Sequence, residues 1–365
     1  MSVEGRDVVA KLEVVSGAFR AGEHVYRAEG SPLYSNLARI GADDPEIVEM
    51  ASHGLASAPP VHLFTSVHYL LLGGIHDPLA QYFPTLTENP LPPEDAWPEF
   101  RRFCMEHRDE LVELLRSRPV QMTYAERCRN IIAPLCYVAD LAGEPLNLIE
   151  IGCSAGVLLT FDRYAYEMRE GERFGPDDAP FTVTGDLVGG PELRIPQVKS
   201  RFGLDLNIID PSSEDDRRWM LATCFPELLE KQSQLAKAMD IVAETDITWM
   251  EGDALVNIRE ALARTPDPVC VYHSACLFYW PEEAKAALDE VLVDESRNRT
   301  IYRFGNEPSD RNNEVMSGRT GTGDEIKNAK KPSGEITFTL YRNGTMERKV
   351  LAESSTTTGA TTWLD

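Results

Sequence analysis

The alternation of strand and helix signals through the second half of this 365-residue chain constrains its fold more than any other feature. Short apolar runs are followed by segments of helical periodicity. Because parallel strands need a long crossover connection, this order of elements predicts a mostly parallel, doubly wound sheet. The expected strands cover 146–150, 201–210, 247–253, 269–274 and 300–304, and the expected helices cover 157–164, 214–239, 256–263 and 281–293.

Two hairpin signals accompany the alternation. Near the C-terminus, residues 335–341 and 347–351 flank Asn343-Gly344, a dipeptide that favours a tight two-residue turn. The run 181–188 reads as a second, smaller hairpin within a stretch rich in Gly, Pro and Asp. We therefore expect an α/β domain over residues 144–365, with about seven strands and a C-terminal hairpin.

The first part of the chain is predicted to be helical. Residues 1–143 carry apolar residues mostly at helical spacing, interrupted by proline-rich joints at Pro59-Pro60 and 89–93. Gly143 ends the last expected helix and releases the chain into the first strand. We expect residues 1–143 to form a helical domain that caps the carboxyl edge of the sheet, because the first strand follows directly from its last helix.

The charge of the chain limits its partners. With 36 basic and 59 acidic residues the formal net charge is -23, so the phosphate backbone of a nucleic acid would be repelled. We expect a small, neutral or cationic molecule as the partner and a nucleic acid as an unlikely one. The histidines at 53, 62, 68 and 76 lack the spacing of a metal-binding motif, so no metal site is predicted.

Cysteine usage and apolar patterning indicate a cytoplasmic protein. The seven cysteines form no C-x-x-C pair, and their odd number argues against a disulfide framework, so reduced thiols are expected. The N-terminus lacks the basic and then apolar layout of a signal peptide. The most apolar long segment, 58–75, is interrupted by prolines and carries His62 and His68, so we expect no membrane span.

The first expected strand leads into the most informative motif of the chain. Glu150 lies at the end of the strand, Gly152 and Gly156 open a tight loop, and Ser154 stands between them. Glycine lets a ligand lie against the backbone, and the amides of a following helix would face a polar group. Glu150 is placed to accept hydrogen bonds from a cationic or hydroxyl-bearing ligand. The pattern resembles motif I of S-adenosylmethionine-dependent methyltransferases, which usually has a third glycine at the position of Ser154.

The same loop also reads as G-x-S-x-G, the nucleophile elbow of α/β-hydrolases, with Ser154 as the nucleophile. Asp253 and His273 follow in the order that such an enzyme needs. His273 lies in an expected strand, however, and no convincing oxyanion segment precedes the loop. A serine hydrolase is therefore the alternative to a methyltransferase, and a non-catalytic module with a degenerate cofactor site is the third hypothesis.

Two further candidates lie at the ends of other expected strands, where ligands bind in open α/β sheets. Asp205, which we favour over Asp210, would accept hydrogen bonds from the ribose hydroxyls of a nucleoside; the alternative is a solvated or capping aspartate. By the methyltransferase resemblance, Asp253 would accept from the adenine amino group; the alternative is a simple N-cap of the helix that follows.

The candidate catalytic residue is His273. Its side chain would act as a general base near neutral pH, and the alternative is a hydrogen-bonded histidine that is partly buried. Arg127 lies just before the helix that leads into the first strand. Its guanidinium would bind a carboxylate of cofactor or substrate, unless it pairs with Glu126 or another acid at the surface.

Several phrases along the chain resemble a prokaryotic family known as Domain of Unknown Function 2332, and the resemblance spans nearly the whole chain. These phrases are Ser31-Pro-Leu-Tyr34, Val67-His-Tyr-Leu-Leu-Leu72, Gly152-Cys-Ser-Ala-Gly-Val157, Asp162-Arg-Tyr164, Gly203-Leu-Asp-Leu-Asn207, Asp216-Arg-Arg-Trp219 and Gly252-Asp-Ala254. The family is methyltransferase-like, which implies a Rossmann-like sheet and S-adenosylmethionine as the cofactor. The leading hypothesis is methyl transfer to a small or medium-sized acceptor. The proposed cofactor-binding residues are Glu150, Gly152, Ser154, Gly156, Asp205, Asp253 and Arg127.

Overall fold

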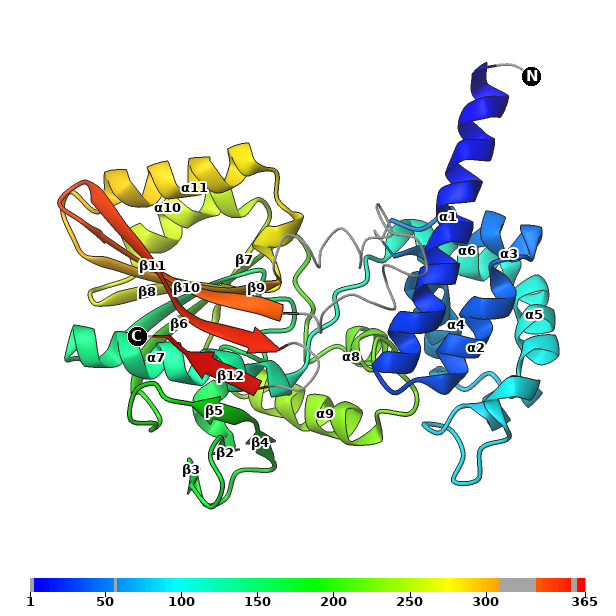
Figure 1. Ribbon diagram of the computed structural model, residues 1–365, viewed down its shortest axis with the longest axis horizontal. Coiled ribbons are helices and arrows are strands. Elements are labelled where there is room, and N and C mark those ends of the chain that lie inside the picture. The colour runs from blue at the N-terminus through cyan, green and yellow to red at the C-terminus, as the bar shows by residue number, and fades with distance from the viewer. Residues whose placement is uncertain (1–2, 56–57, 309–332, 356–359, 365) are drawn as a thin grey trace. The chain divides into compact units, whose positions relative to one another are not determined.

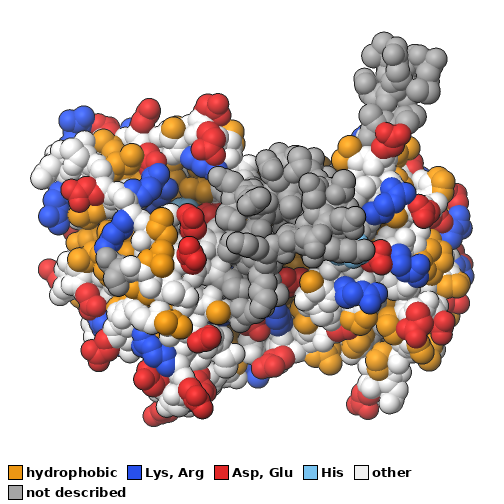
Figure 2. Space-filling model, in the orientation of Figure 1, with side chains coloured by type: hydrophobic (Ala, Val, Ile, Leu, Met, Phe, Trp, Pro, Cys, Tyr) orange, Lys and Arg blue, Asp and Glu red, His pale blue; other side chains and the backbone are white. Residues whose placement is uncertain are grey.

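The computed structural model describes residues 3–55, 58–308, 333–355 and 360–364, which group into two compact units (Figure 1). Among the described residues, the helical unit comprises residues up to 122 and residues 214–233. The sheet unit comprises 123–213, 234–308 and the described residues from 333 onward. On the face of the molecule in Figure 2, acidic and basic side chains are interspersed over both units.

The helical unit is built from α-helices and short 3₁₀ helices around an apolar core. Phe19, Tyr34, Phe64 and Phe100 are buried in that core and pack edge to face or tilted against one another. Prolines begin three of the α-helices and both 3₁₀ helices of this unit, since a proline at the first position costs no hydrogen bond. The helices are α1 (Val3–Ala28), α2 (Pro32–Gly41), α3 (Pro45–Ala51), α4 (Pro59–Leu72), η1 (Pro78–Tyr82), η2 (Pro93–Asp95), α5 (Trp97–Glu106), α6 (Arg108–Ser117) and α8 (Glu214–Ala222).

The division into units differs from the predicted one at two places. Helix α7 (Cys128–Ala142) was expected in the helical domain, but it packs on strands of the sheet. Residues 214–233 were expected in the sheet domain, but Glu227 accepts hydrogen bonds from Ser31 Oγ at 2.6 Å and from the Leu33 amide at 2.7 Å. The half-buried Glu227 carboxylate thus holds this segment on the N-terminus of α2.

Among the described residues, the main sheet has nine strands in the order β5-β12-β11-β10-β9-β8-β1-β6-β7. The five strands from β9 to β7 are mutually parallel, and β10, β11 and β12 are antiparallel to their preceding neighbours. The strands are β1 (Leu146–Ile151), β5 (Asp186–Val188), β6 (Val198–Asp205), β7 (Thr248–Glu251), β8 (Val269–Ser274), β9 (Ile301–Pro308), β10 (Ser333–Arg342), β11 (Thr345–Ser355) and β12 (Ala360–Trp363). The prediction of a mostly parallel α/β sheet is confirmed, although two more strands are present than the seven expected.

Helices cover both faces of this sheet (Figure 1). Helices α10 (Ala254–Arg264) and α11 (Glu282–Glu295) bury Ile258 and Leu288 against Ile149, Ile151 and Val271. Helix α7 lies on the other face, next to β9 and β10. Beyond the main sheet, β2 (Ala165–Glu167) pairs with β3 (Arg173–Phe174) and β4 (Thr182–Thr184).

Three predicted elements are corrected by the structure. The run 181–188 is not a hairpin, because β4 pairs with β2 whereas β5 pairs with β12. The expected helix 214–239 is two helices, α8 and α9 (Leu229–Ala243). The expected helix 157–164 is a series of tight turns that ends in η4 (Phe161–Arg163).

The turns replace that helix because the Val157 carbonyl has other partners. It accepts hydrogen bonds from Thr160 Oγ1 at 3.2 Å and from the Tyr164 hydroxyl at 2.7 Å. Side-chain hydroxyls that bond nearby carbonyls compete with the helical ladder. The left-handed φ of 71° at Gly156 also interrupts a right-handed helix just before it begins. The described segment that directly follows the loop after β1 therefore does not present an α-helix N-terminus to it.

Among the helices that the structure describes, none combines the length and the apolarity that crossing a membrane requires. All seven cysteines are free thiols, as predicted. Six of them are buried and Cys276 is half-buried.

Candidate functional site

The carboxyl ends of β1, β6, β8 and β9 bring most of the predicted site residues to one edge of the sheet. Glu150 in β1 is in register with Tyr272 of β8 on one side and with Gly203 of β6 on the other. The strand order reverses between β1 and β8, because the chain crosses from β1 to β6 on one side and β8 lies on the other side. Ligands of open α/β sheets bind at such a reversal.

Asp205 lies beside the loop that follows β1, as its place at the end of β6 predicted. Its Oδ2 accepts a hydrogen bond from the Ser154 amide at 2.7 Å, and its Oδ1 accepts one from the Asn207 amide at 3.0 Å. The Gly152 amide donates to the Leu204 carbonyl at 2.8 Å. The buried carboxylate of Asp205 therefore holds the loop in place, a role that the sequence did not predict.

The two glycines of the loop are required by conformation and by packing inside the protein. Gly152 and Gly156 have φ angles of 77° and 71°, which favour glycine. A Cβ on Gly152 would clash with Cys276 and lie 2.7 Å from its Cβ; one on Gly156 would lie 2.5 Å from the Trp249 ring. These glycines thus fit closely against side chains of the sheet unit, whatever ligand the edge binds.

Glu150 is a buried acid without a cationic partner. Only 1% of its surface is exposed, and its Oε2 accepts a hydrogen bond from the Tyr272 hydroxyl at 3.2 Å. Burial raises the pKa of Glu150 well above its usual range, and the nearby Asp205 raises it further, against the opposing effects of Tyr272 and Arg127. Among the described residues Glu150 forms no ion pair, so its burial favours the neutral form of the carboxyl group.

Arg127 is the candidate cationic binding group at this edge. It ends the 3₁₀ helix η3 (Ala125–Arg127) before α7, and its half-buried guanidinium forms no hydrogen bond or ion pair with any described residue. Burial lowers the pKa of Arg127, whereas Tyr124, Tyr279, Glu307 and Glu150 act electrostatically to raise it.

His273 lies at the end of β8 with only 3% of its surface exposed. Its Nδ1 is 2.6 Å from Glu307 Oε1, and the same carboxylate accepts hydrogen bonds from the amides of Cys276, Leu277 and Phe278 at 3.1–3.2 Å. His273 Nε2 is buried and has no hydrogen-bond partner among the described residues. A carboxylate only accepts hydrogen bonds, so Nδ1 carries the ring hydrogen.

Glu307 is a site residue that sequence reasoning missed. The expected strand ended at Phe304, but β9 continues to Pro308 and carries Glu307 to the same edge as His273. An acidic residue next to the buried run was the only local signal. Burial works to raise the pKa of Glu307, but His273 and the loop amides outweigh it and lower the pKa below its usual value.

Asp253 and Ser154 are not joined to His273 by hydrogen bonds, as the hydrolase hypothesis would require. Asp253 is exposed and caps α10 by accepting the Leu255 amide at 2.8 Å, which is the alternative role considered from the sequence. Ser154 is buried at a φ of 51°. No hydrogen bond joins it to His273, because His273 Nδ1 binds Glu307 and Nε2 has no partner in the described chain.

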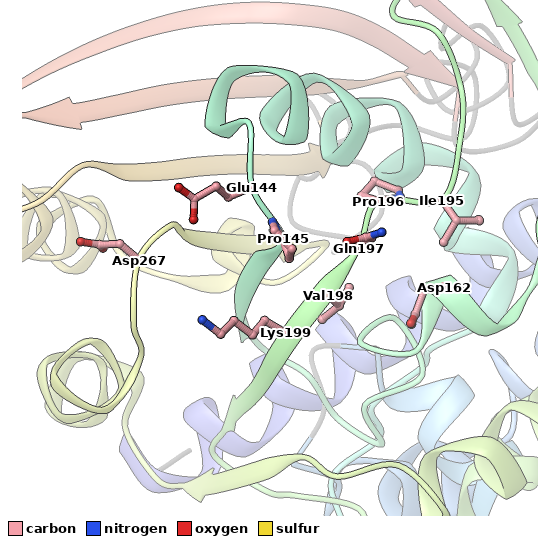
Figure 3. A pocket seen from close by; sticks show the side chains of 9 residues that line it. All are labelled: Glu144, Pro145, Asp162, Ile195, Pro196, Gln197, Val198, Lys199 and Asp267. Atoms are coloured by element: carbon pink, nitrogen blue, oxygen red, sulfur yellow. The ribbon is translucent and has the colours of Figure 1, made fainter.

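A surface cavity of about 580 Å³ lies at the opposite, amino edge of the strands (Figure 3). Pro145 precedes β1, Lys199 is the second residue of β6, and Asp267 precedes β8. The other lining residues are Glu144, Asp162, Ile195, Pro196, Gln197 and Val198. We place the candidate site at the carboxyl edge, because the buried ionisable groups described above converge there rather than around this cavity.

Comparison with known proteins places the chain by family only. No curated protein matches the chain. A profile described as "Uncharacterized protein conserved in bacteria (DUF2332)" matches residues 18–363, nearly the whole length. The two units and the ionisable groups at the carboxyl edge therefore fall inside a single family match, and the chain belongs to the DUF2332 family.

Proposed function

We propose that the carboxyl edge of the sheet binds S-adenosylmethionine and that the protein transfers its methyl group to a small acceptor. The observation that carries this proposal is that buried Glu150 and half-buried Arg127 act electrostatically on each other, although neither forms an ion pair with another described residue. Both belong to the sheet unit, and each acts electrostatically on the other. A ligand with both charges would satisfy them together.

S-adenosylmethionine fits this set of groups. Its sulfonium and ammonium groups are cations, suited to Glu150, and its carboxylate is suited to the fork of donors on Arg127. Ionising a buried acid is costly, and a close cation offsets that cost. Asp205 ends β6 at the same edge, and its carboxylate is the group suited to the ribose hydroxyls, with Gly252 and Asp253 on the adenine side. The groups present are thus compatible with the cofactor.

The strand order supports the same proposal. The five parallel strands β7-β6-β1-β8-β9 have the 3-2-1-4-5 arrangement of doubly wound nucleotide-binding sheets. An antiparallel hairpin, β10 and β11, then follows. On this proposal the core of the sheet is Rossmann-like, with β12 and β5 as additions at the hairpin edge. The cofactor supplies the electrophilic methyl group, and the protein contributes mainly by holding the reactants in line.

Calorimetry of the full-length protein tests the proposal. We expect S-adenosylmethionine and S-adenosylhomocysteine to bind, and NAD not to bind. Glu150→Gln and Arg127→Met should each weaken S-adenosylmethionine binding at least tenfold, or ~1.4 kcal/mol. Glu144→Gln, at the opposite edge, is the matched control and should leave the affinity unchanged. Absence of heat and of thermal shift with both ligands at millimolar concentration would refute the proposal.

A further inference from the structure

We propose that His273 Nε2 accepts a proton from the methyl acceptor and that Glu307 is the positioning residue that aims it. The acceptor is then a compound with an O–H or N–H group that must lose its proton on methylation. This inference rests on the proposed cofactor site and adds the class of the second substrate.

The geometry gives His273 one defined form. Three consecutive amides, those of Cys276, Leu277 and Phe278, hold the Glu307 carboxylate, so its position next to Nδ1 is fixed by backbone and not by solvent. The hydrogen on Nδ1 leaves a lone pair on Nε2. This is the arrangement by which a carboxylate orients a histidine that acts as a base.

The Nε2 lone pair is kept without a partner at an energetic cost. A buried polar atom that makes no hydrogen bond destabilises the folded protein, and native proteins contain few such atoms. Gly305 of the neighbouring strand β9 leaves space for the imidazole ring, because a Cβ at that position would lie only 2.6 Å from His273 Nε2. We interpret this atom, near the carboxyl end of β8 and beside Gly305 of β9, as one that a bound donor satisfies.

The charges around the ring favour its neutral, proton-accepting form. Burial lowers the pKa of His273, and Arg303 and Arg348 lower it further, which outweighs the raising effect of Glu307. The neutral form of the ring, which can accept a proton, is therefore favoured. Once protonated, it would form an ion pair with Glu307 across the existing 2.6 Å contact.

The transfer step balances with these groups. The lone pair of the acceptor oxygen or nitrogen forms the bond to the methyl carbon, while the electron pair of the S–CH3 bond remains on sulfur. The acceptor proton moves to His273 Nε2 and later leaves to solvent. The products are the methylated acceptor, the neutral thioether and a proton.

The experiment compares His273→Gln and Glu307→Gln with His107→Gln. His107 is a matched control, because its Nδ1 also contacts a glutamate, Glu110 at 2.8 Å, in the helical unit. Nitrogen-15 NMR of the imidazoles should show His273 with the hydrogen on Nδ1, and Glu307→Gln should change its tautomer balance or its titration. Calorimetry with S-adenosylmethionine should give affinities within twofold of wild type for His273→Gln and His107→Gln.

Methyl transfer is then measured from methyl-labelled S-adenosylmethionine to a panel of alcohols, phenols, primary amines and tertiary amines. We expect transfer to at least one acceptor with a transferable proton, lowered at least 100-fold by His273→Gln and at least tenfold by Glu307→Gln. Four outcomes would each overturn the inference while leaving cofactor binding intact. They are methyl transfer only to tertiary amines, no methyl transfer to any acceptor, a ring hydrogen found on Nε2, and a threefold or smaller effect of His273→Gln on transfer. Absence of cofactor binding would instead remove the proposed function on which it rests.

Discussion

Asp205→Asn tests whether one carboxylate holds the loop after β1 in place. The two oxygens of Asp205 accept the amides of Ser154 and Asn207, and an asparagine has one acceptor oxygen and one donor nitrogen. Whichever way the amide group turns, one backbone N–H faces another donor. A hydrogen bond to a charged acceptor contributes about 1.5–3 kcal/mol, so we expect a loss of about 2–3 kcal/mol in the free energy of unfolding.

Guanidinium unfolding followed by circular dichroism measures this loss, and the midpoint of thermal unfolding should fall by about 5–10 °C for a unit of this size. Asp210→Asn is the matched control, because Asp210 is exposed and its Oδ1 accepts the Ser212 amide in a local turn. Its effect should stay near 0.5 kcal/mol, as for other surface substitutions. Equal effects of the two substitutions would refute the reasoning.

Three further predictions concern the same edge. Because burial raises the pKa of Glu150, the native protein should lose stability as pH rises from about 4.5 through that raised pKa. In urea titrations, Glu150→Gln should abolish this part of the pH dependence. An unchanged pH profile of the variant would contradict the prediction. Gly152→Ala should destabilise the protein by about 2–4 kcal/mol through its φ and the Cys276 side chain, and adding Cys276→Gly should recover the packing part but not the ~1–2 kcal/mol of backbone strain. Ser154→Gly should bind S-adenosylmethionine within about tenfold of wild type, whereas fluorophosphonate labelling that this substitution removes would favour the hydrolase alternative.

The parallel part of the sheet could be predicted from sequence because its signals are local. Strand β8 runs from Val269 to Ser274, as its apolar run indicated. The C-terminal hairpin turns at Asn343-Gly344, whose φ angles of 54° and 75° are those of the turn that this dipeptide favours. Burial on both faces and turn chemistry both act within a few residues, so a short window of sequence contains them.

The failures lie where side-chain hydrogen bonds or strand partners, rather than local propensity, decide the structure. The segment after Gly156 has the composition of a helix, but Tyr164 bonds the Val157 carbonyl and the turn geometry follows. The run 181–188 has the composition of a hairpin, but its two halves pair with strands from elsewhere in the chain. In each case propensity was outweighed by contacts that only the folded chain provides.

For the candidate site, the motif and strand-end patterns were sufficient to select Glu150, Asp205 and His273 as residues of one sheet edge. Their actual environments follow from tertiary structure: Glu150 has a tyrosine and no cation, Asp205 binds the loop backbone, and His273 is oriented by Glu307. Burial and hydrogen-bond partners determine charge state and direction, and both depend on residues that are dozens of positions apart in the sequence. Local patterns therefore identify which groups reach the edge, whereas only the fold decides what those groups can do there.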